Sequence, residues 1–293
     1  MNRRFFLRAA AAALAAGAVP GVLAQSKPAA APARARAKAK KTFLQDHPLL
    51  TSLFGGETDR ELMAKAANSE FDGADAIAYD LGRLDPKFRN EKTFARIINA
   101  VNLPAMFLVY RNDKFLKRDD DARQEVLLTA ADAGATMIDV MGDLYDPSPM
   151  EFTRKPEAVE KQKRLVDKIH SKGAEVVISS HTGKFLTTEQ VLEHMKSLEA
   201  RGADVVKLVQ NTNTELELEE AIRTTFALRR ELKVPFIHLC GGKFSRIHRF
   251  FGPALGVSIF FAVQRFESGT AVQPTIRAMR AVLDNLHWNI NAM

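Results

Sequence analysis

The stretch EVVISSHTGKFLTTEQVLEHMKSLEARGADVVKLVQ, residues 175–210, alternates between two patterns of secondary structure. Its two ends, EVVISSH and DVVKLVQ, are short runs rich in Val and Ile, which are typical of buried strands. Between them, apolar residues recur at helical spacing, from a Thr cap at Thr187 to a terminal Gly202. The stretch therefore predicts two strands joined by a helix, the connection that parallel neighbouring strands require.

The same alternation runs through the chain from about residue 46. Eight apolar runs predict strands, at 48–55, 74–81, 104–110, 136–142, 175–181, 204–210, 235–241 and 257–263. Helical patterns follow these runs, at 58–71, 91–101, 121–134, 155–173, 187–202, 215–232, 245–252 and 274–288. Strands alternating with helices over roughly 250 residues predict an α/β protein, an eight-stranded parallel (β/α)8 TIM barrel. An open doubly wound sheet is the main alternative.

The amino terminus has the composition of an export signal. It reads NRRFFLRAAAAALAAGAVPGVLAQS, a charged start followed by an apolar stretch that is short for a membrane span. The RRxFLR pattern at 3–8 resembles the bacterial twin-arginine signal, and VLA at 22–24 precedes a cleavage site. We expect a cleaved signal peptide over 1–24, a disordered basic Pro/Ala-rich linker over 25–45 and a barrel domain over 46–293, in the periplasm. An ordinary secretory signal or an uncleaved anchor are the alternatives.

Most of the excess positive charge lies in this leader. The formal net charge is +7, but residues 1–41 hold nine Lys and Arg and no Asp or Glu, which leaves 33 basic and 35 acidic residues elsewhere. A near-neutral body gives no reason to expect a nucleic-acid partner. The single cysteine, Cys240, excludes an intrachain disulfide, which agrees with a protein that folds before twin-arginine export. We expect Cys240 to be a small core residue.

Lys207 lies in the middle of an apolar run. Burial of a lysine ammonium lowers its pKa toward the neutral amine, which is a nucleophile. The alternative is a side chain whose head group reaches water at the end of the strand. In a barrel, the carboxyl ends of the strands line one mouth, and neighbouring strands lie about 4.8 Å apart. Lys207 and His181, on neighbouring predicted strands, can therefore face one substrate.

The segments ISSHTGKF, GADVVKLV, GGKFSR with FGPALGVSIFFA, and GTAVQP resemble the successive signature segments of type I 3-dehydroquinate dehydratases. These are class I β/α barrels that act through a lysine Schiff base, and the resemblance spans residues 46–288. It implies that Lys207 is the Schiff-base lysine and His181 the general acid and base. It also implies a set of substrate-binding residues: Arg246 for the carboxylate, Gln273 with Ser268 or Thr270 on the loop over the site, and Arg111 after the third strand.

The amino-terminal half departs from this family pattern. Residues 78–80, Ala-Tyr-Asp, stand where a Glu-x-Arg pair is usual on the second strand, and Met141 stands where an acidic residue is common. No Glu follows Arg111 to orient the histidine, and Asp113 is the candidate substitute. These changes predict altered substrate preference or weak activity.

The resemblance implies a lyase that dehydrates 3-dehydroquinate or a related carboxylated cyclic hydroxyketone. The export signal places it outside the cytoplasm, and that location favours a role in quinate- or shikimate-type catabolism. The expected partners are a small carboxylated substrate, the twin-arginine machinery and a second copy in a homodimer, with no membrane span after cleavage. Without a GxGxxG or P-loop motif, and without His ligand spacing, we expect no cofactor and no metal. His238, in an apolar strand, is expected to be a satisfied core histidine. The alternative function is a divergent barrel, non-catalytic or of different specificity, that binds a carboxylated sugar-like ligand.

Overall fold

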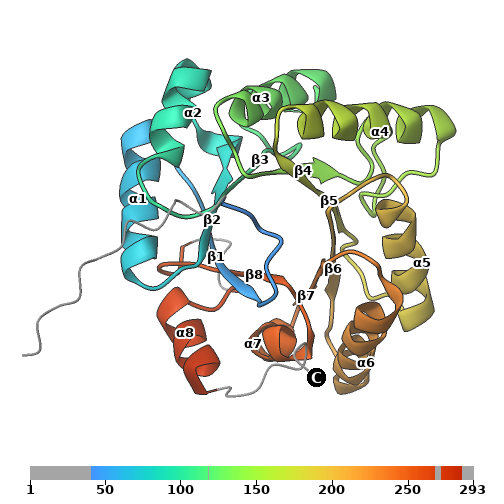
Figure 1. Cartoon of the computed structure of the whole chain (residues 1–293). Coiled ribbons are helices and arrows are strands. Elements are labelled where there is room, and N and C mark those ends of the chain that lie inside the picture. Colours follow the sequence, from blue (N-terminus) through green and yellow to red (C-terminus); the bar gives the residue numbers. More distant parts are fainter. Residues whose placement is uncertain (1–40, 118, 268–271, 286–293) are drawn as a thin grey trace, which may run out of the picture. The chain divides into compact units, whose positions relative to one another are not determined.

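The computed structural model describes residues 41–117, 119–267 and 272–285. Within them, eight strands alternate with helices around a single sheet, as Figure 1 shows. The strands are β1 (Leu49–Gly55), β2 (Ala76–Asp80), β3 (Ala105–Leu108), β4 (Met137–Met141), β5 (Glu175–His181), β6 (Val205–Asn211), β7 (Phe236–Gly241) and β8 (Ile259–Ala262). The α-helices are α1 (Asp59–Phe71), α2 (Glu91–Ile98), α3 (Asp120–Asp132), α4 (Pro156–Ser171), α5 (Thr188–Glu199), α6 (Glu215–Glu231), α7 (Ser245–Leu255) and α8 (Ile276–Asn285), with short 3-10 turns at Leu81–Arg83 and Pro86–Phe88.

The sheet is a nearly closed barrel of parallel strands, which confirms the predicted TIM barrel. Its order is β7-β6-β5-β4-β3-β2-β1-β8, so β1 pairs with both β2 and β8. The remaining seam lies between β7 and β8. There the backbone N–H of Ser258 donates to the Phe236 carbonyl at 3.0 Å, and the Ser258 hydroxyl donates to the same oxygen at 2.9 Å. The alternative of an open doubly wound sheet is therefore wrong.

Helix starts follow the capping residues in the sequence. Thr187 and Thr214 each form a capping box, in which the Thr side chain and the side chain three residues later exchange hydrogen bonds with backbone N–H groups. The predicted strands are confirmed with small shifts at their ends. The third strand ends at Leu108, two residues before the predicted end, so Tyr110 and Arg111 lie in the loop after β3.

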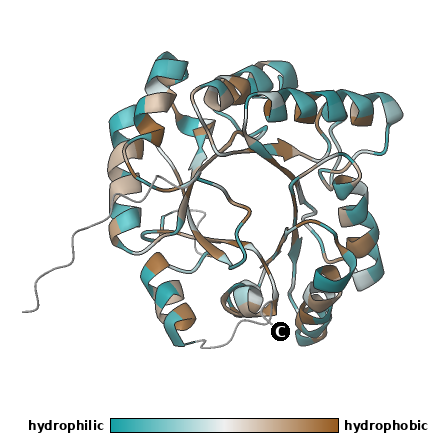
Figure 2. Cartoon of the chain, viewed as in Figure 1, coloured by the Kyte–Doolittle hydropathy of each residue, from teal (hydrophilic) through white to brown (hydrophobic). Residues whose placement is uncertain are grey.

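Apolar side chains fill both the inside of the barrel and the space between sheet and helices. Along β6, Val205, Lys207 and Val209 point inward, whereas Val206 and Leu208 pack against the helices. In Figure 2 the strand ring is largely hydrophobic, while the helices carry many hydrophilic residues. Lys207 is thus a charged residue in an inner row of apolar ones.

The last residues of the predicted linker contact the barrel. Phe43, within the predicted linker, is only 1% exposed and belongs to the apolar cluster inside the barrel. Its backbone N–H donates to Glu175 Oε2 at 2.9 Å, and the Thr42 hydroxyl donates to the same carboxylate. Residues 42 and 43 therefore pack against the amino end of β5. The predicted signal peptide lies outside the described residues.

No helix in the described ranges is both long and apolar enough to cross a bilayer.

Candidate active site

Lys207 and His181 lie on the neighbouring strands β6 and β5, and His181 is the nearer to the carboxyl ends of the strands. In the β5–β6 register Lys207 is opposite Ser179, and His181 is opposite Val209, two residues further along. Both side chains line one small chamber of about 120 Å³. The Lys207 residue is 5% exposed, so its amine does not extend into bulk water. The structure thus brings together the two residues that the sequence predicts for the reaction.

The Lys207 amine has a buried acidic partner that the sequence analysis missed. Its Nζ donates to the Tyr110 hydroxyl at 2.8 Å and to Asp139 Oδ2, on β4, at 3.4 Å. The Tyr110 hydroxyl in turn donates to Asp139 Oδ2 at 2.7 Å, and Ser179 Oγ donates to Oδ1 at 2.5 Å. Burial and the Asp139 carboxylate raise the pKa of Tyr110 well above its ordinary value. Tyr110 is therefore a neutral phenol that bridges the amine and the carboxylate.

Aromatic rings also face the Lys207 amine. Its Nζ lies 5.4 Å from the ring centroid of Tyr110 and 5.2 Å from that of Phe261, on β8. A cation is attracted to ring faces at such distances. Lys207 therefore has polar and aromatic partners inside the protein, and the alternative of a side chain that only reaches for water is wrong.

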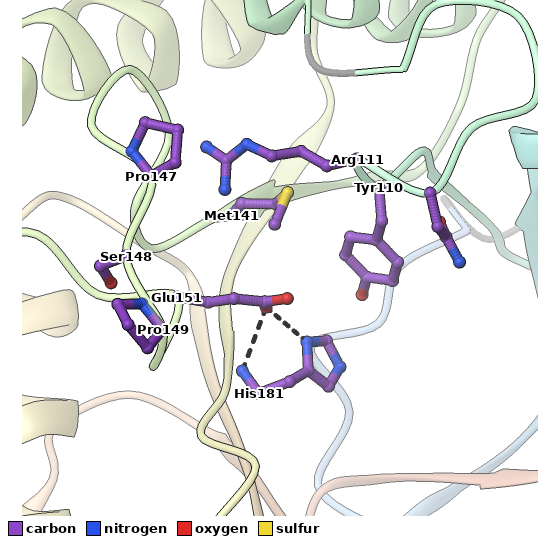
Figure 3. A pocket seen from close by; sticks show the side chains of 9 residues that line it. Tyr110, Arg111, Met141, Pro147, Ser148, Pro149, Glu151 and His181 are labelled. Carbon is purple, nitrogen blue, oxygen red and sulfur yellow. Dashed lines mark hydrogen bonds and ion pairs between the residues drawn. The ribbon is translucent and has the colours of Figure 1, made fainter.

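His181 is oriented by Glu151, from the loop between β4 and α4. The Nδ1 atom lies 2.6 Å from Glu151 Oε2, and the backbone N–H of His181 donates to the same oxygen at 3.1 Å, as Figure 3 shows. A carboxylate only accepts, so Nδ1 carries a proton. The Ser180 hydroxyl donates to the Glu151 carbonyl at 2.7 Å and ties the loop to β5. The arrangement fixes the orientation of the imidazole ring.

Asp113, the predicted orienting acid, does not contact His181. Its carboxylate is fully buried and pairs with Arg89 at 2.6 Å. It also accepts hydrogen bonds from the backbone N–H groups of Phe115 and Leu116, so it shapes its own loop. Glu151 was missed because it lies in an irregular loop, where no periodicity indicates which way a side chain points.

Two cavities meet at the site. The larger, of about 740 Å³, lies over the loops after β3 and β4 and is partly lined by Arg111, Met141 and Glu151. The smaller is the chamber around Lys207. Tyr110 and His181 line both cavities, so they stand between an outer vestibule and the amine.

The comparison with known proteins agrees with this geometry. Residues 54–290 match the family model described as type I 3-dehydroquinase. The chain belongs to the type I 3-dehydroquinase family. A curated 3-dehydroquinate dehydratase from Alkaliphilus oremlandii is 28% identical over 125 residues, which cover 42% of this chain and 49% of that protein. The chain thus matches about half the length of that relative.

Solved structures of the same kind share the fold. The crystal structure of 3-dehydroquinate dehydratase from Geobacillus kaustophilus superposes with a TM-score of 0.70 at 20% identity, covering 82% of this chain and 91% of that one. The type I 3-dehydroquinate dehydratase from Clostridium difficile, with covalently modified comenic acid, gives 0.70 at 18% identity, covering 83% and 94%. At these identities the likeness establishes the barrel alone.

Arg111, a predicted substrate-binding residue of this family member, is held by two carboxylates. Its Nε and Nη2 donate to Asp120 at 3.0 and 2.9 Å, and its Nη1 donates to Asp143 Oδ1 at 2.7 Å. Nη2 also donates to the Asp143 carbonyl at 3.0 Å. These bonds engage all but one of the five N–H groups of a guanidinium. Arg111 lines the vestibule, but most of its hydrogen-bonding capacity goes to the protein.

Arg246, for which the resemblance predicts binding of the substrate carboxylate, lies on the first turn of α7 and is exposed. Its guanidinium carbon is 4.9 Å from the Phe266 ring centroid, and it lines neither cavity. Gln273 does line the chamber, where its Oε1 accepts from Arg249 at 2.7 Å. The other two predicted loop contacts, Ser268 and Thr270, fall outside the described residues. Arg249 was not predicted, because the resemblance assigns the role to the arginine one turn earlier.

The second strand of this family member carries no polar side chain of the usual kind. Ala78 packs inside the barrel, and Tyr79 faces outward, with its ring centroid 5.0 Å from that of Phe107. Asp80 turns back on its own loop, where Oδ1 accepts from the Gly82 N–H at 2.8 Å. Burial raises the pKa of this carboxyl above its ordinary value. The chamber wall is instead aliphatic or aromatic, formed by Leu53, Leu108, Val209, Leu239 and Phe261.

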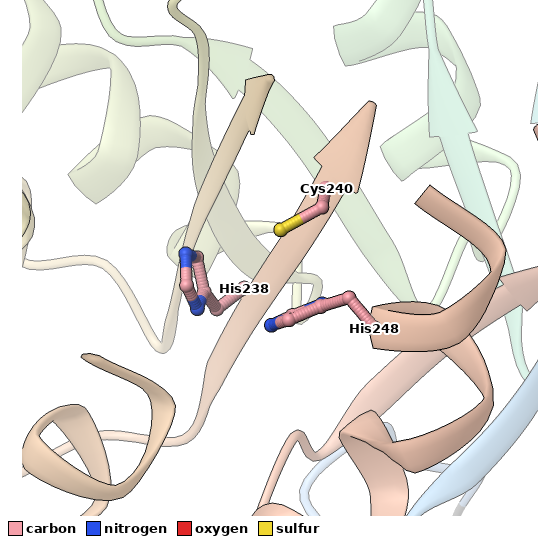
Figure 4. Close-up of side chains that lie close together, drawn as sticks. All are labelled: His238, Cys240 and His248. Atoms are coloured by element: carbon pink, nitrogen blue, oxygen red, sulfur yellow. The ribbon is translucent and has the colours of Figure 1, made fainter. Parts of the chain in front are cut away.

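A second cluster, outside the barrel, contains potential metal ligands. His238, Cys240 and His248 are buried between β7 and α7 and place their ligand atoms within 4.8 Å of one another, as Figure 4 shows. Both ring nitrogens of His238 are already occupied, because Nδ1 bonds to Thr225 Oγ1 at 2.8 Å and Nε2 accepts from Gln210 at 3.0 Å. Burial raises the pKa of the Cys240 thiol to about 12. A metal would have to displace a hydrogen bond and a thiol proton. Packing in the core therefore explains this cluster better than a metal site does.

Proposed function

We propose that this chain is a lyase that removes water from 3-dehydroquinate, or from a related carboxylated cyclic hydroxyketone, through a Schiff base on Lys207. The observation that carries the proposal is a buried lysine amine and a carboxylate-oriented histidine that line the same chamber, in a chain of the type I 3-dehydroquinase family. The Clostridium difficile relative holds covalently modified comenic acid, which supports covalent chemistry in this family.

The first step is attack of the lysine amine on the ketone. Asp139, 3.4 Å from Nζ, is placed to take the ammonium proton directly or through the Tyr110 hydroxyl. The neutral amine then adds to the ketone carbon. Asp139 returns its proton to the departing hydroxyl, water leaves, and a cationic iminium forms. Its charge lies where the ammonium charge lay, opposite the carboxylate. The Asp139 carboxylate therefore offsets the positive charge of both the ammonium and the iminium.

The second step is elimination, and His181 performs both proton transfers. The iminium acidifies the neighbouring carbon, so Nε2 of a neutral imidazole is a sufficient base. The Glu151 carboxylate on Nδ1 stabilises the imidazolium that results. The imidazolium then gives the proton to the departing hydroxyl, and water leaves. Hydrolysis of the conjugated iminium consumes one water, releases the enone and restores Lys207.

Trapping with borohydride tests this proposal. Borohydride reduces the iminium to a stable amine, so incubation of the wild type with 3-dehydroquinate should add a ligand mass that peptide mapping places on Lys207. Lys207→Met should give neither adduct nor turnover. His181→Ala should still form the iminium but slow elimination by about 10² to 10⁴, so its adduct should accumulate.

Lys184 provides the matched control, because it is an exposed lysine on the loop after β5. Lys184→Met should trap and turn over like the wild type. Binding of 3-dehydroquinate without any adduct in the wild type would instead support the alternative of a binding barrel. Size-exclusion chromatography with light scattering tests the homodimer that the resemblance implies.

We further propose that the protein acts in the periplasm, in catabolism of quinate-type compounds. The support is the twin-arginine-like pattern at residues 3–8 together with a single cysteine. An enzyme outside the cytoplasm suits the breakdown of compounds taken from the surroundings better than the biosynthesis of aromatic compounds.

A further inference from the structure

We propose that Arg249, rather than Arg246, binds the carboxylate of the substrate. The inference deepens the proposed function, on which it rests for the nature of the ligand. Arg249 is 5% exposed and lines the chamber together with Lys207 and His181. A ligand whose ketone meets Lys207 can therefore place an anionic group against this guanidinium.

The first argument is the missing counter-ion. Within the described part of the chain, no carboxylate pairs with Arg249, whose contacts are the Cys240 carbonyl, 2.8 Å from Nε, and Gln273 Oε1, 2.7 Å from Nη1. Burial lowers the pKa of Arg249 to about 10, which still leaves it a cation at neutral pH. A buried cation without an acidic partner is costly, and an anionic ligand would remove that cost. Lys207, in the same chamber, already has Asp139.

Arg201 shows what a buried structural arginine looks like in this protein. It too lacks a carboxylate partner among the described residues, and burial lowers its pKa to about 10. Its terminal nitrogens, however, donate to three oxygens of the protein, on Gly142, Gln162 and Thr153, each at 2.7 Å. It lines neither cavity. Among the described residues, the terminal nitrogens of Arg249 donate one such bond, from Nη1 to Gln273, and Arg249 lines the chamber, so Nη2 is available for a carboxylate oxygen.

The histidine cluster of Figure 4 holds Arg249 in place. Thr225 Oγ1, on α6, accepts from His238 Nδ1 at 2.8 Å and from His248 Nε2 at 3.1 Å, so it links β7 to α7. His248 directly precedes Arg249 in the chain. The Nε of Arg249 donates to the Cys240 carbonyl, which fixes the guanidinium. A guanidinium fixed in advance loses little entropy when it binds a carboxylate. The Cys240 carbonyl and the link between β7 and α7 thus position Arg249.

The test measures how each arginine is coupled to the ligand carboxylate. Lys207→Met serves as the parent, because it lacks the amine and so should bind without forming an adduct. Calorimetry compares its binding of 3-dehydroquinate and of the methyl ester. The parent should prefer the carboxylate by about tenfold or more. Adding Arg249→Gln should abolish that preference, whereas adding Arg246→Gln should leave it within about twofold.

The proposal is overturned if the preference survives Arg249→Gln, if Arg246→Gln abolishes it, or if the parent shows no preference. Thermal unfolding checks that each variant is folded. If Arg249→Gln does not fold, Arg249→Lys decides, because it keeps the charge but loses the fork and should reduce the preference several-fold. Failure of the Schiff-base chemistry would appear in borohydride trapping and not in this readout, which uses a protein without Lys207.

Discussion

Strands β5 to β8 and the segments that follow them carry the groups proposed to react with or bind the substrate, whereas β1 to β3 present mainly aliphatic walls. His181, Lys207 and Arg249 come from the first region, and Leu53 and Leu108 from the second. The carboxylates that serve the reacting groups come from β4 and the loop after it. Under the proposed function, the groups for the chemistry are therefore separable from those that recognise the rest of the substrate. A family member can keep the first set while it changes the second.

The largest effect is expected at the Lys207–Asp139 pair, which joins β6 to β4. Lys207→Met removes the nucleophile, so we expect no measurable formation of the conjugated enone. It also leaves the Asp139 carboxylate buried, with hydrogen bonds from Tyr110 and Ser179 but no counter-ion. Breaking such a pair costs about 3–5 kcal/mol of unfolding free energy. Urea denaturation followed by circular dichroism measures this loss.

The double variant Lys207→Met/Asp139→Asn separates charge from packing. It removes both members of the pair, so part of the lost stability should return while activity stays absent. If Lys207→Met were as stable as the wild type, the Lys207–Asp139 pair would not contribute to the free energy of unfolding. If it were fully active, the Schiff-base mechanism would be wrong.

A smaller effect is expected at Glu151. Glu151→Gln keeps the size of the side chain but removes the charge that stabilises the imidazolium and fixes the Nδ1 proton. We expect kcat to fall by about 10², the lower end of what general acid–base catalysis contributes, with KM within about twofold. Steady-state kinetics of the enone product measure both. Exposed Glu157, on α4, is the control position; equal effects of Glu157→Gln and Glu151→Gln would remove Glu151 from the mechanism.

The sequence predicts one region of the site much better than the other. The strand rhythm and the family segments place Lys207 and His181 correctly, because both follow from local pattern. Their partners are distant in the chain: Tyr110 is 97 residues from Lys207, and Asp139 is 68 residues from it. Glu151 lies 30 residues before His181 in a loop with no periodic pattern. Such contacts are set by barrel closure and loop conformation, which a strand or helix period does not specify.

Acidification should lower the free energy of unfolding through His194, on α5. Burial, with the nearby Arg201 charge, lowers the pKa of His194 to about 3, below the ordinary value of 6.5. The unfolded chain therefore binds a proton between pH 6.5 and 3 that the folded chain does not, and stability falls as the pH falls through this window. His194→Gln should reduce the slope by up to about 1.4 kcal/mol per pH unit. Denaturation at pH 7, 6 and 5 measures it; an unchanged slope would mean that His194 is protonated in the folded state.

The smallest effect on catalysis is expected from Arg3 and Arg4, although their effect on location should be complete. Replacing both with Lys keeps the charge but alters a signal that a receptor reads, so the protein should stay in the cytoplasm. Activity per mole of purified protein should not change, because the reacting groups all lie in the barrel. Cell fractionation and the enone assay measure the two properties, with Arg34→Lys/Arg36→Lys as the control. Undiminished periplasmic protein in the Arg3→Lys/Arg4→Lys variant would reject the twin-arginine route. Cytoplasmic protein with full activity would instead show that the barrel folds before export. A chain with one cysteine and no disulfide allows this.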